Sequence, residues 1–82
     1  MNFYLTPHAK KRMKDRAISQ EFITDALRIP TKIMYDEKGR ILVKKLYFKG
    51  GKERILLIVG EFVKDKLEII TVIDTSKVKK YL

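Results

Sequence analysis

Hydrophobic residues recur at a helical spacing in the first third of the chain. Ala9 and Met13 lie four residues apart and form a narrow apolar stripe in an otherwise basic segment. The next segment repeats apolar positions in adjacent pairs one turn apart, as a buried helical face does: Phe22, Ile23, Ala26 and Leu27. The pattern predicts two helices, over about residues 7–16 and 20–29.

Residues at the ends of these segments indicate the same two helices. Thr6 and Ser19 can each cap the free N–H groups of a helix start, and Pro7 loses no hydrogen bond at the first helical position. Pro30 disfavours helical backbone at the residue before it, so the second helix should end there. Residues 7–29 are therefore predicted to form a helical hairpin.

From residue 31 onward the hydrophobic period becomes that of strands. Gly39 and the Gly50-Gly51 pair mark turns, because glycine adopts the positive φ that tight hairpin turns require. The most apolar segment is expected to be a central strand, buried on both faces. Strands are predicted at about residues 32–35, 40–48, 54–63 (the central one) and 67–74.

The predicted fold is one α+β domain over residues 1–82. An N-terminal helical hairpin packs on a three- to four-stranded antiparallel meander sheet and covers one of its faces. The other face, with Lys and Arg, is expected to be open to solvent or used for binding. Residues 1–5 are expected to form an edge strand or a staple onto the first helix, and residues 76–82 a basic tail or a last helical turn.

The charge balance adds information about the ligand. The chain has 19 basic and 10 acidic residues, a formal net charge of +9. Such a charge attracts a polyanion: nucleic acid, an anionic membrane or an acidic protein. We expect the surplus cations to gather on one accessible side of the domain. The alternative is a charge that only keeps the protein soluble.

Cysteine and histidine content limits the chemistry. The chain has no Cys and a single His, which excludes disulfides, thiolate zinc sites and multi-histidine metal sites. We expect no metal and no cofactor. The apolar segment at residues 1–5 is too short for a signal peptide, and no apolar run is long enough to span a membrane. A soluble, cytoplasmic protein is expected.

A histidine and several cations share one face of the first predicted helix. His8, Lys11, Arg12 and Asp15 follow helical spacing, with Arg16 at the edge of that face. His8 among cations could act as a neutral base, while Lys11 and the arginines bind a phosphate. The alternative is a structural clasp in which His8 and Arg12 hydrogen-bond the sheet.

Further cations and aromatic residues lie in the strand-rich half. Arg54 flanks the glycine turn and is a second candidate for holding a phosphate. Rings beside cations can stack bases while the cations neutralise phosphates. The alternative is that the rings pack the core, which the pattern favours more for Phe48 than for Tyr81. The candidate substrate-binding residues here are Lys45, Tyr47, Lys77 and Tyr81.

The segment Thr6–Ser19 resembles the opening signature of a prokaryotic family, domain of unknown function 4258. Its pattern H-A-x-x-R-M-x-x-R-x-I-S is matched in full, with Ala17 where a Gly is common. The resemblance continues through Ile70-Thr71-Val72 to Ser76-Lys77 and covers nearly the whole chain. The family is similar in size and layout to RelE/ParE- and BrnT-like toxins of toxin–antitoxin systems. That likeness implies mRNA cleavage at the ribosome or binding to an acidic antitoxin protein.

Two functions from different classes follow. One is a toxin-like, metal-independent endoribonuclease, in which the 2′-OH of RNA is the nucleophile and His8 the general base or acid. The arginines would hold the scissile phosphate and a tyrosine would stack a base: Arg12, Arg16 and Arg54, with Tyr47 or Tyr81. The other is a non-catalytic protein that binds RNA or an antitoxin. DNA is a less favoured partner, because the second helix exposes acidic residues that phosphate repels.

Overall fold

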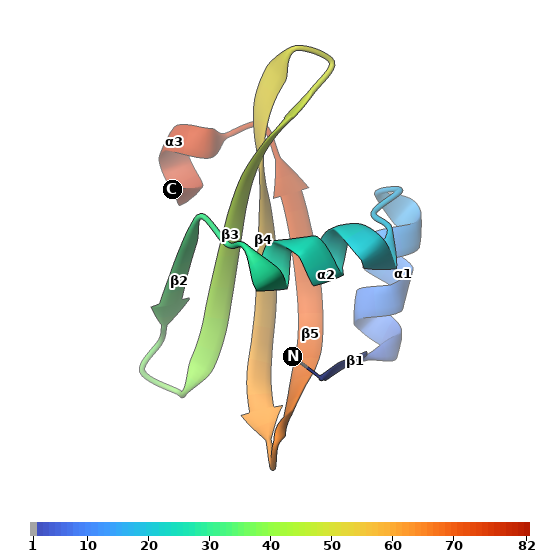
Figure 1. The fold of residues 1–82 in the computed structure, drawn as a ribbon, viewed down its shortest axis with the longest axis vertical. Coiled ribbons are helices and arrows are strands. Elements are labelled where there is room, and N and C mark those ends of the chain that lie inside the picture. The colour runs from blue at the N-terminus through green and yellow to red at the C-terminus, as the bar shows by residue number, and fades with distance from the viewer. Residues whose placement is uncertain (1) are drawn as a thin grey trace.

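A five-stranded sheet runs through the molecule, with two helices on one face (Figure 1). The computed structural model describes residues 2–82. The sheet order is β1-β5-β4-β3-β2, and the pairs β2–β3, β3–β4 and β4–β5 are antiparallel. The elements are β1 (Phe3–Leu5), α1 (Pro7–Asp15), α2 (Gln20–Arg28), β2 (Lys32–Tyr35), β3 (Arg40–Lys49), β4 (Lys52–Val63), β5 (Lys66–Thr75) and α3 (Val78–Tyr81).

The β3–β4 hairpin turns on two glycines, as predicted. Lys49 pairs with Lys52, so Gly50 and Gly51 alone form the turn, with φ of 59° and 76°. Two consecutive positive φ values define the type I′ turn, whose twist matches that of the flanking strands. The following strand, β4, has four consecutive buried residues over 55–58, which confirms it as the central strand buried on both faces.

The prediction of a purely antiparallel, three- to four-stranded meander is wrong at the N-terminus. β1 pairs with β5 in parallel, with Phe3 opposite Leu67, and makes the sheet mixed. Leu67 N donates to Asn2 O at 3.1 Å, and Thr6 N donates to Ile69 O at 3.1 Å. Of the two roles expected for this segment, that of edge strand is confirmed.

The two long helices form where predicted, but they do not lie side by side as a simple hairpin on the sheet. Thr6 Oγ1 accepts from Ala9 N at 3.1 Å, and Ser19 Oγ accepts from Phe22 N at 3.0 Å, so both predicted caps are confirmed. α1 runs along β5 at one side, whereas α2 crosses the strands (Figure 1). The short turn between them therefore lies at one corner of the sheet.

The main core lies between these helices and the sheet. The apolar stripes of both helices meet inward-facing residues of the three long strands. Gly60 faces this core where the β4–β5 register shifts, and a Cβ there would lie 2.9 Å from Glu68 O. The buried residues of the core are Ala9, Met13, Ile18, Ile23, Ala26, Leu27, Ile41, Val43, Leu56, Ile58, Leu67, Ile69 and Val72.

The opposite face of the sheet is more apolar than predicted. Ile55 and Leu57 point away from the main core and are nonetheless buried. The helical turn α3 contacts β4 behind the sheet and contributes half-buried Val78 and Tyr81 (Figure 1). Lys44 is the basic residue at the middle of this face. None of the helices in residues 2–82 has the length and apolar character that crossing a bilayer requires.

Ala17 closes α1 in a left-handed conformation, with φ of 54°. Ile18 N donates to Met13 O at 2.8 Å across this residue. A left-handed conformation costs a non-glycine residue about 1–2 kcal/mol. Glycine avoids this cost, but its greater conformational freedom in the unfolded chain offsets part of the gain in stability. We therefore expect Ala17→Gly to raise the free energy of unfolding by about 0.5–1 kcal/mol. Urea denaturation measures it, and Lys10→Gly inside α1 should lower stability by a similar amount.

Candidate functional site

Three side chains from adjacent strands meet at one end of the sheet, on the face that carries the helices. Tyr47 of β3 lies directly opposite Arg54 of β4, and Leu56, two residues on, lies opposite Asp74 of β5. Tyr47 Oη donates to Asp74 Oδ1 at 2.5 Å, and Arg54 Nε donates to the same oxygen at 3.1 Å. We call Tyr47, Arg54 and Asp74 the strand-end cluster.

The carboxylate organises this cluster. Its side chain is 8% exposed, compared with 28% for that of Arg54, so Asp74 is the inner member of the ion pair. The hydrogen bond from Arg54 to Asp74 raises the pKa of the guanidinium above its already high value. Burial, and next the hydrogen bond to Asp74, raise the pKa of Tyr47. At neutral pH the cluster is therefore an Arg54–Asp74 ion pair with a protonated phenol.

A hollow of about 340 Å³ opens beside the cluster. This volume is near the lower end of the range for small-ligand sites, about 300–1,000 Å³. One wall is the turn between α1 and α2, and the opposite wall is the end of β3. The lining residues are Arg16, Ala17, Ile18, Ser19, Phe22, Tyr47, Phe48, Lys49 and Asp74. We call this space the corner hollow.

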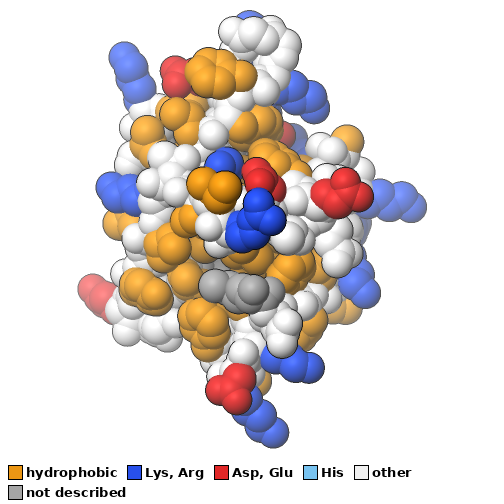
Figure 2. All heavy atoms as spheres, in the orientation of Figure 1, with side chains coloured by type: hydrophobic (Ala, Val, Ile, Leu, Met, Phe, Trp, Pro, Cys, Tyr) orange, Lys and Arg blue, Asp and Glu red, His pale blue; other side chains and the backbone are white. Residues whose placement is uncertain are grey.

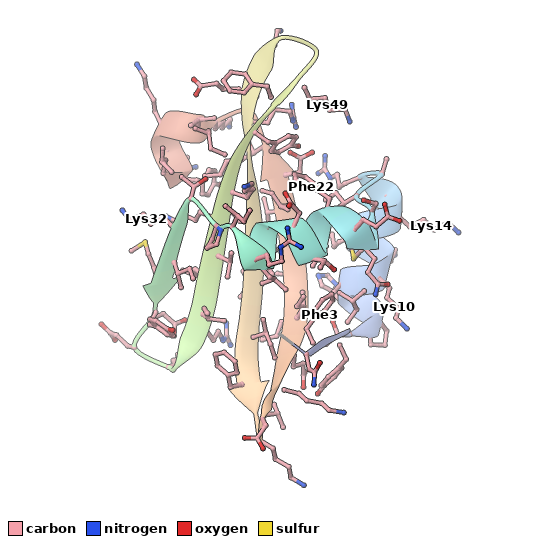
Figure 3. All side chains as sticks on the ribbon, in the orientation of Figure 1. Phe3, Lys10, Lys14, Phe22, Lys32 and Lys49 are labelled. Carbon is pink, nitrogen blue, oxygen red and sulfur yellow. The ribbon has the colours of Figure 1, made fainter. Side chains whose placement is uncertain are left out.

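An aromatic pair forms part of the wall. The rings of Phe22 and Tyr47 meet edge to face, with centroids 4.8 Å apart and planes at 72°. Phe22 extends from α2 toward the upper part of the sheet, and Lys49 projects from the nearby hairpin (Figure 3). The hollow thus combines an apolar ring surface with cations at its edge, which suits a flat, negatively charged ligand.

The cations are mostly unpaired, and they do not gather in one patch on the face that carries the helices. In the described part of the chain, residues 2–82, the only ion pair within 4.0 Å is that of Arg54 and Asp74. Figure 2 shows the Lys and Arg side chains scattered around the rim and at the middle of this face, not in a single patch. The expectation of one basic side is therefore not met on the face that carries the helices. The corner hollow still has a local excess of cations, because Arg16 and Lys49 line it and its one carboxylate, Asp74, is paired with Arg54.

The predicted catalytic residues do not meet at one point. Arg16 lines the corner hollow and Arg54 bonds to Asp74 there. His8 is exposed near the other end of α1, where the Thr6 hydroxyl donates to Ile70 O. Eight helical residues span about 12 Å, so the helix separates His8 from Arg16 by that distance.

The other members of that helical face are also outside the hollow. Arg12 and Lys11 are exposed on α1, and neither lines the corner hollow. Arg12 lies one turn, about 6 Å along the helix axis, from Arg16. The proposed clasp, in which His8 and Arg12 hydrogen-bond the sheet, is not formed by their side chains in the described residues.

The predicted substrate-binding residues of the strand-rich half divide between three places. Tyr47 is part of the strand-end cluster. Lys45 Nζ donates to Ile29 O at 2.6 Å and so holds the end of α2 against β3. Lys77 lines a separate surface depression beside α3, and Tyr81 belongs to α3 itself, with Lys80 Nζ 5.5 Å from its ring centroid.

Three residues of the site were not identified from the sequence as binding candidates. Asp74 ends an apolar strand and had no motif around it, Lys49 was one of several cations near the glycine turn, and Phe22 belonged to a predicted buried helical face. Successive side chains of a strand point to opposite faces of the sheet. This alternation was the available signal that Arg54 and Asp74 lie on the same face as Tyr47. The preference for Phe48 as a core residue is wrong: it is 70% exposed, because it lies near the tip of the hairpin beyond the core.

The raised pKa of Tyr47 gives a titration that can be measured. Its proton is held by burial and by Asp74, so the phenol should ionise at a higher pH than an exposed tyrosine. The pKa of Tyr47 is higher in the folded than in the unfolded chain. Its contribution to the stability of the fold is therefore complete below the ordinary tyrosine pKa and is lost as pH rises through the folded pKa. Absorbance titration should show that Tyr47→Phe removes a late-ionising phenol. If the phenol that is missing from the variant's titration curve ionises at the ordinary tyrosine pKa in the original protein, the hydrogen-bonded cluster is contradicted.

Comparison of the chain with protein-family models, with curated proteins and with solved structures gives no match in any of the three. The functional argument therefore depends on the geometry of this chain's own residues.

Proposed function

We propose that the protein binds single-stranded RNA, and that the corner hollow is where it does so. The observation that carries this proposal is the combination of Arg16 and Lys49 with the Phe22–Tyr47 ring pair around one hollow. Cations neutralise phosphates, and ring surfaces contact unstacked bases, which only single strands or loops present. Arg54 balances the charge of Asp74, so Arg16 and Lys49 remain as the unpaired cations of the hollow.

The size of the hollow favours an unpaired nucleotide over a duplex. A space of about 340 Å³ between a helical turn and a strand end can take a single base with its phosphate at the edge. Duplex recognition instead needs an element that enters a groove or spans it. The α2 face beside the hollow carries Gln20 and Glu21 at its start, and the acidic side chain disfavours a helix laid along a phosphate backbone.

Binding of a short fluorescent single-stranded RNA, measured by anisotropy at several salt concentrations, tests the proposal. The logarithm of affinity should fall with the logarithm of salt by about 0.7 for each phosphate contacted. A 12-base-pair duplex of the same composition is expected to bind more weakly. Equal affinity for the duplex, or affinity that salt does not change, would remove the corner hollow as an RNA site.

Cleavage of RNA, in the manner of RelE- and BrnT-like toxins, is a second candidate function. The observation that favours it is the strand-end cluster: Tyr47 and Asp74 line the hollow, and Arg54 forms an ion pair with Asp74 beside it. RNA supplies its own 2′-OH nucleophile, so positioning and charge stabilisation would suffice. In this mechanism the Asp74 carboxylate accepts the 2′-OH proton as the 2′-oxygen bonds to phosphorus, and the Tyr47 hydroxyl protonates the 5′-oxygen as its bond to phosphorus breaks. Arg54 would stabilise charge on the scissile phosphate. His8 would act only if the RNA reached along α1.

The cleavage assay uses mRNA with and without ribosomes, and a 2′-deoxy substrate as control. Tyr47→Phe and Arg54→Lys should each lose most of the activity, while His8→Ala tests the role first assigned to the histidine. If the mRNA stays uncleaved both with and without ribosomes, cleavage is ruled out and RNA binding is the remaining function. If His8→Ala abolishes cleavage while Tyr47→Phe does not, the active centre lies on α1 and not in the hollow.

A further inference from the structure

The edge strand β2 is unusually open. All four of its residues are exposed, among them Ile33 at 42%, Met34 at 39% and Tyr35 at 69%. β2 pairs only with β3 and forms one border of the sheet. Proteins commonly protect such borders, since an edge strand with apolar side chains can pair with another strand.

The turn after β2 shows which backbone groups are free. Asp36 N donates to Arg40 O at 3.0 Å, and Gly39 N donates to Asp36 O at 3.2 Å. Asp36 and Arg40 are thus a hydrogen-bonded pair of the β2–β3 ladder. Because such pairs alternate with non-bonded ones, Ile33 and Tyr35 direct their N–H and C=O groups away from β3, toward the open edge.

We propose that β2 pairs in antiparallel fashion with β2 of a second copy, about a two-fold axis that passes beside Met34. In this register Ile33 lies opposite Tyr35 of the partner subunit, and the reverse. Both free N–H and C=O pairs on each edge are then used. In a register centred on Ile33, that residue would pair with its own copy and Tyr35 would lie opposite a residue beyond the partner's strand. A register centred on Tyr35 would leave Ile33 in the same position.

The side chains fit the same register. Lys32 lies opposite Asp36 of the partner subunit, and the symmetry forms this opposite-charge pair twice. Ile33 and Tyr35 make aliphatic–aromatic cross-strand contacts on the helix face, and Met34 meets its own copy on the opposite face. The three exposed apolar side chains of β2 are therefore all covered. This self-complementarity of sequence and charge is why a second copy is the occupant that fits.

The contact is expected to be weak. A strand of four residues covers less surface than stable dimers usually do, about 1,200–2,000 Å² in total. Each copy also carries a net charge of +9, which opposes association until salt screens it. The dimer should therefore form reversibly and in proportion to concentration. It does not depend on RNA binding, because β2 pairs with residues 41–44 of β3, whereas the β3 wall of the corner hollow is residues 47–49 at the far end of that strand.

Single cysteines test the register, because the chain has no Cys of its own. Met34 faces its own copy as a non-hydrogen-bonded pair, with Cα atoms about 4.5 Å apart, within disulfide range. Lys32, on the outer side of β2 in Figure 3, would be about 13 Å from its copy. In an oxidised glutathione buffer, Met34→Cys should form the covalent dimer at least about tenfold faster than Lys32→Cys. Equal rates for the two variants would overturn the proposal.

Sedimentation equilibrium of the cysteine-free protein gives a second, independent test. Ile33→Pro removes an outward N–H and leaves the β2–β3 ladder intact, as proline in edge strands does. It should abolish the concentration-dependent dimer, while Ile33→Thr retains it. Both variants should bind RNA as the original chain does, so failure here and failure of the RNA proposal can be told apart. A wild-type protein that stays monomeric at millimolar concentration would contradict the proposed pairing.

Discussion

Replacing Arg16 and Lys49 together by alanine is expected to weaken binding of single-stranded RNA by about tenfold at 0.15 M salt. The estimate follows from counterion release, since each phosphate contact on a single strand contributes about 0.7 to the salt slope. Loss of two contacts should therefore also reduce that slope by about 1.4. The two residues come from the helical turn and the hairpin, on opposite walls of the corner hollow.

A matched variant separates the hollow from the overall charge. Lys10→Ala with Lys38→Ala removes the same two positive charges from exposed positions on α1 and in the β2–β3 turn. If the hollow is the site, this variant should lose no more than about twofold in affinity, through the weaker long-range field alone. Equal losses in both double variants would mean that RNA contacts the charged rim without a preferred place.

The largest effect on stability is expected from Leu56→Ala. Leu56 is fully buried on the central strand, in the core cluster and directly opposite Asp74. Removing a buried leucine side chain costs about 2–5 kcal/mol, since both the transfer energy and the packing around the cavity are lost. A domain of this length has a total stability of about 4–12 kcal/mol, so the loss is a large part of it.

Urea denaturation followed by circular dichroism measures this loss as a lower midpoint at an unchanged slope. Phe62→Ala is the matched control on the same strand, because its ring is 49% exposed. It should cost less than half as much. A Leu56→Ala protein as stable as the control would contradict the placement of this side chain at the centre of the core.

Much of the fold follows from local rules that the sequence displays. Thr6 and Ser19 cap helices through their own hydroxyls, and the Gly50-Gly51 turn needs only the φ freedom of two residues. β1 was harder to predict, because three residues are too few to show a period and its parallel partner is more than sixty residues away. The angle between α1 and α2 likewise depends on tertiary packing, which no local pattern encodes.

Some residues of the site were predictable one by one, but the group was not. Tyr47, Arg54 and Arg16 were each candidates from residue type and neighbourhood. The contacts of Tyr47 and Arg54 with Asp74 depend on the register across three strands, which determines the residues that lie opposite each other. His8 shows the converse: it shares a helical face with the arginines, but the length of α1 keeps it from the hollow.

Chemical-shift mapping with a short single-stranded RNA locates the binding site most directly. In ¹⁵N–¹H spectra of the labelled protein, the largest changes should fall in the helical turn at residues 16–19 and at the β3 end, residues 47–49, with Asp74. Amides around His8 and on β2 should change little. Changes confined to those two segments or to α3, with the corner hollow unaffected, would contradict RNA binding at the hollow.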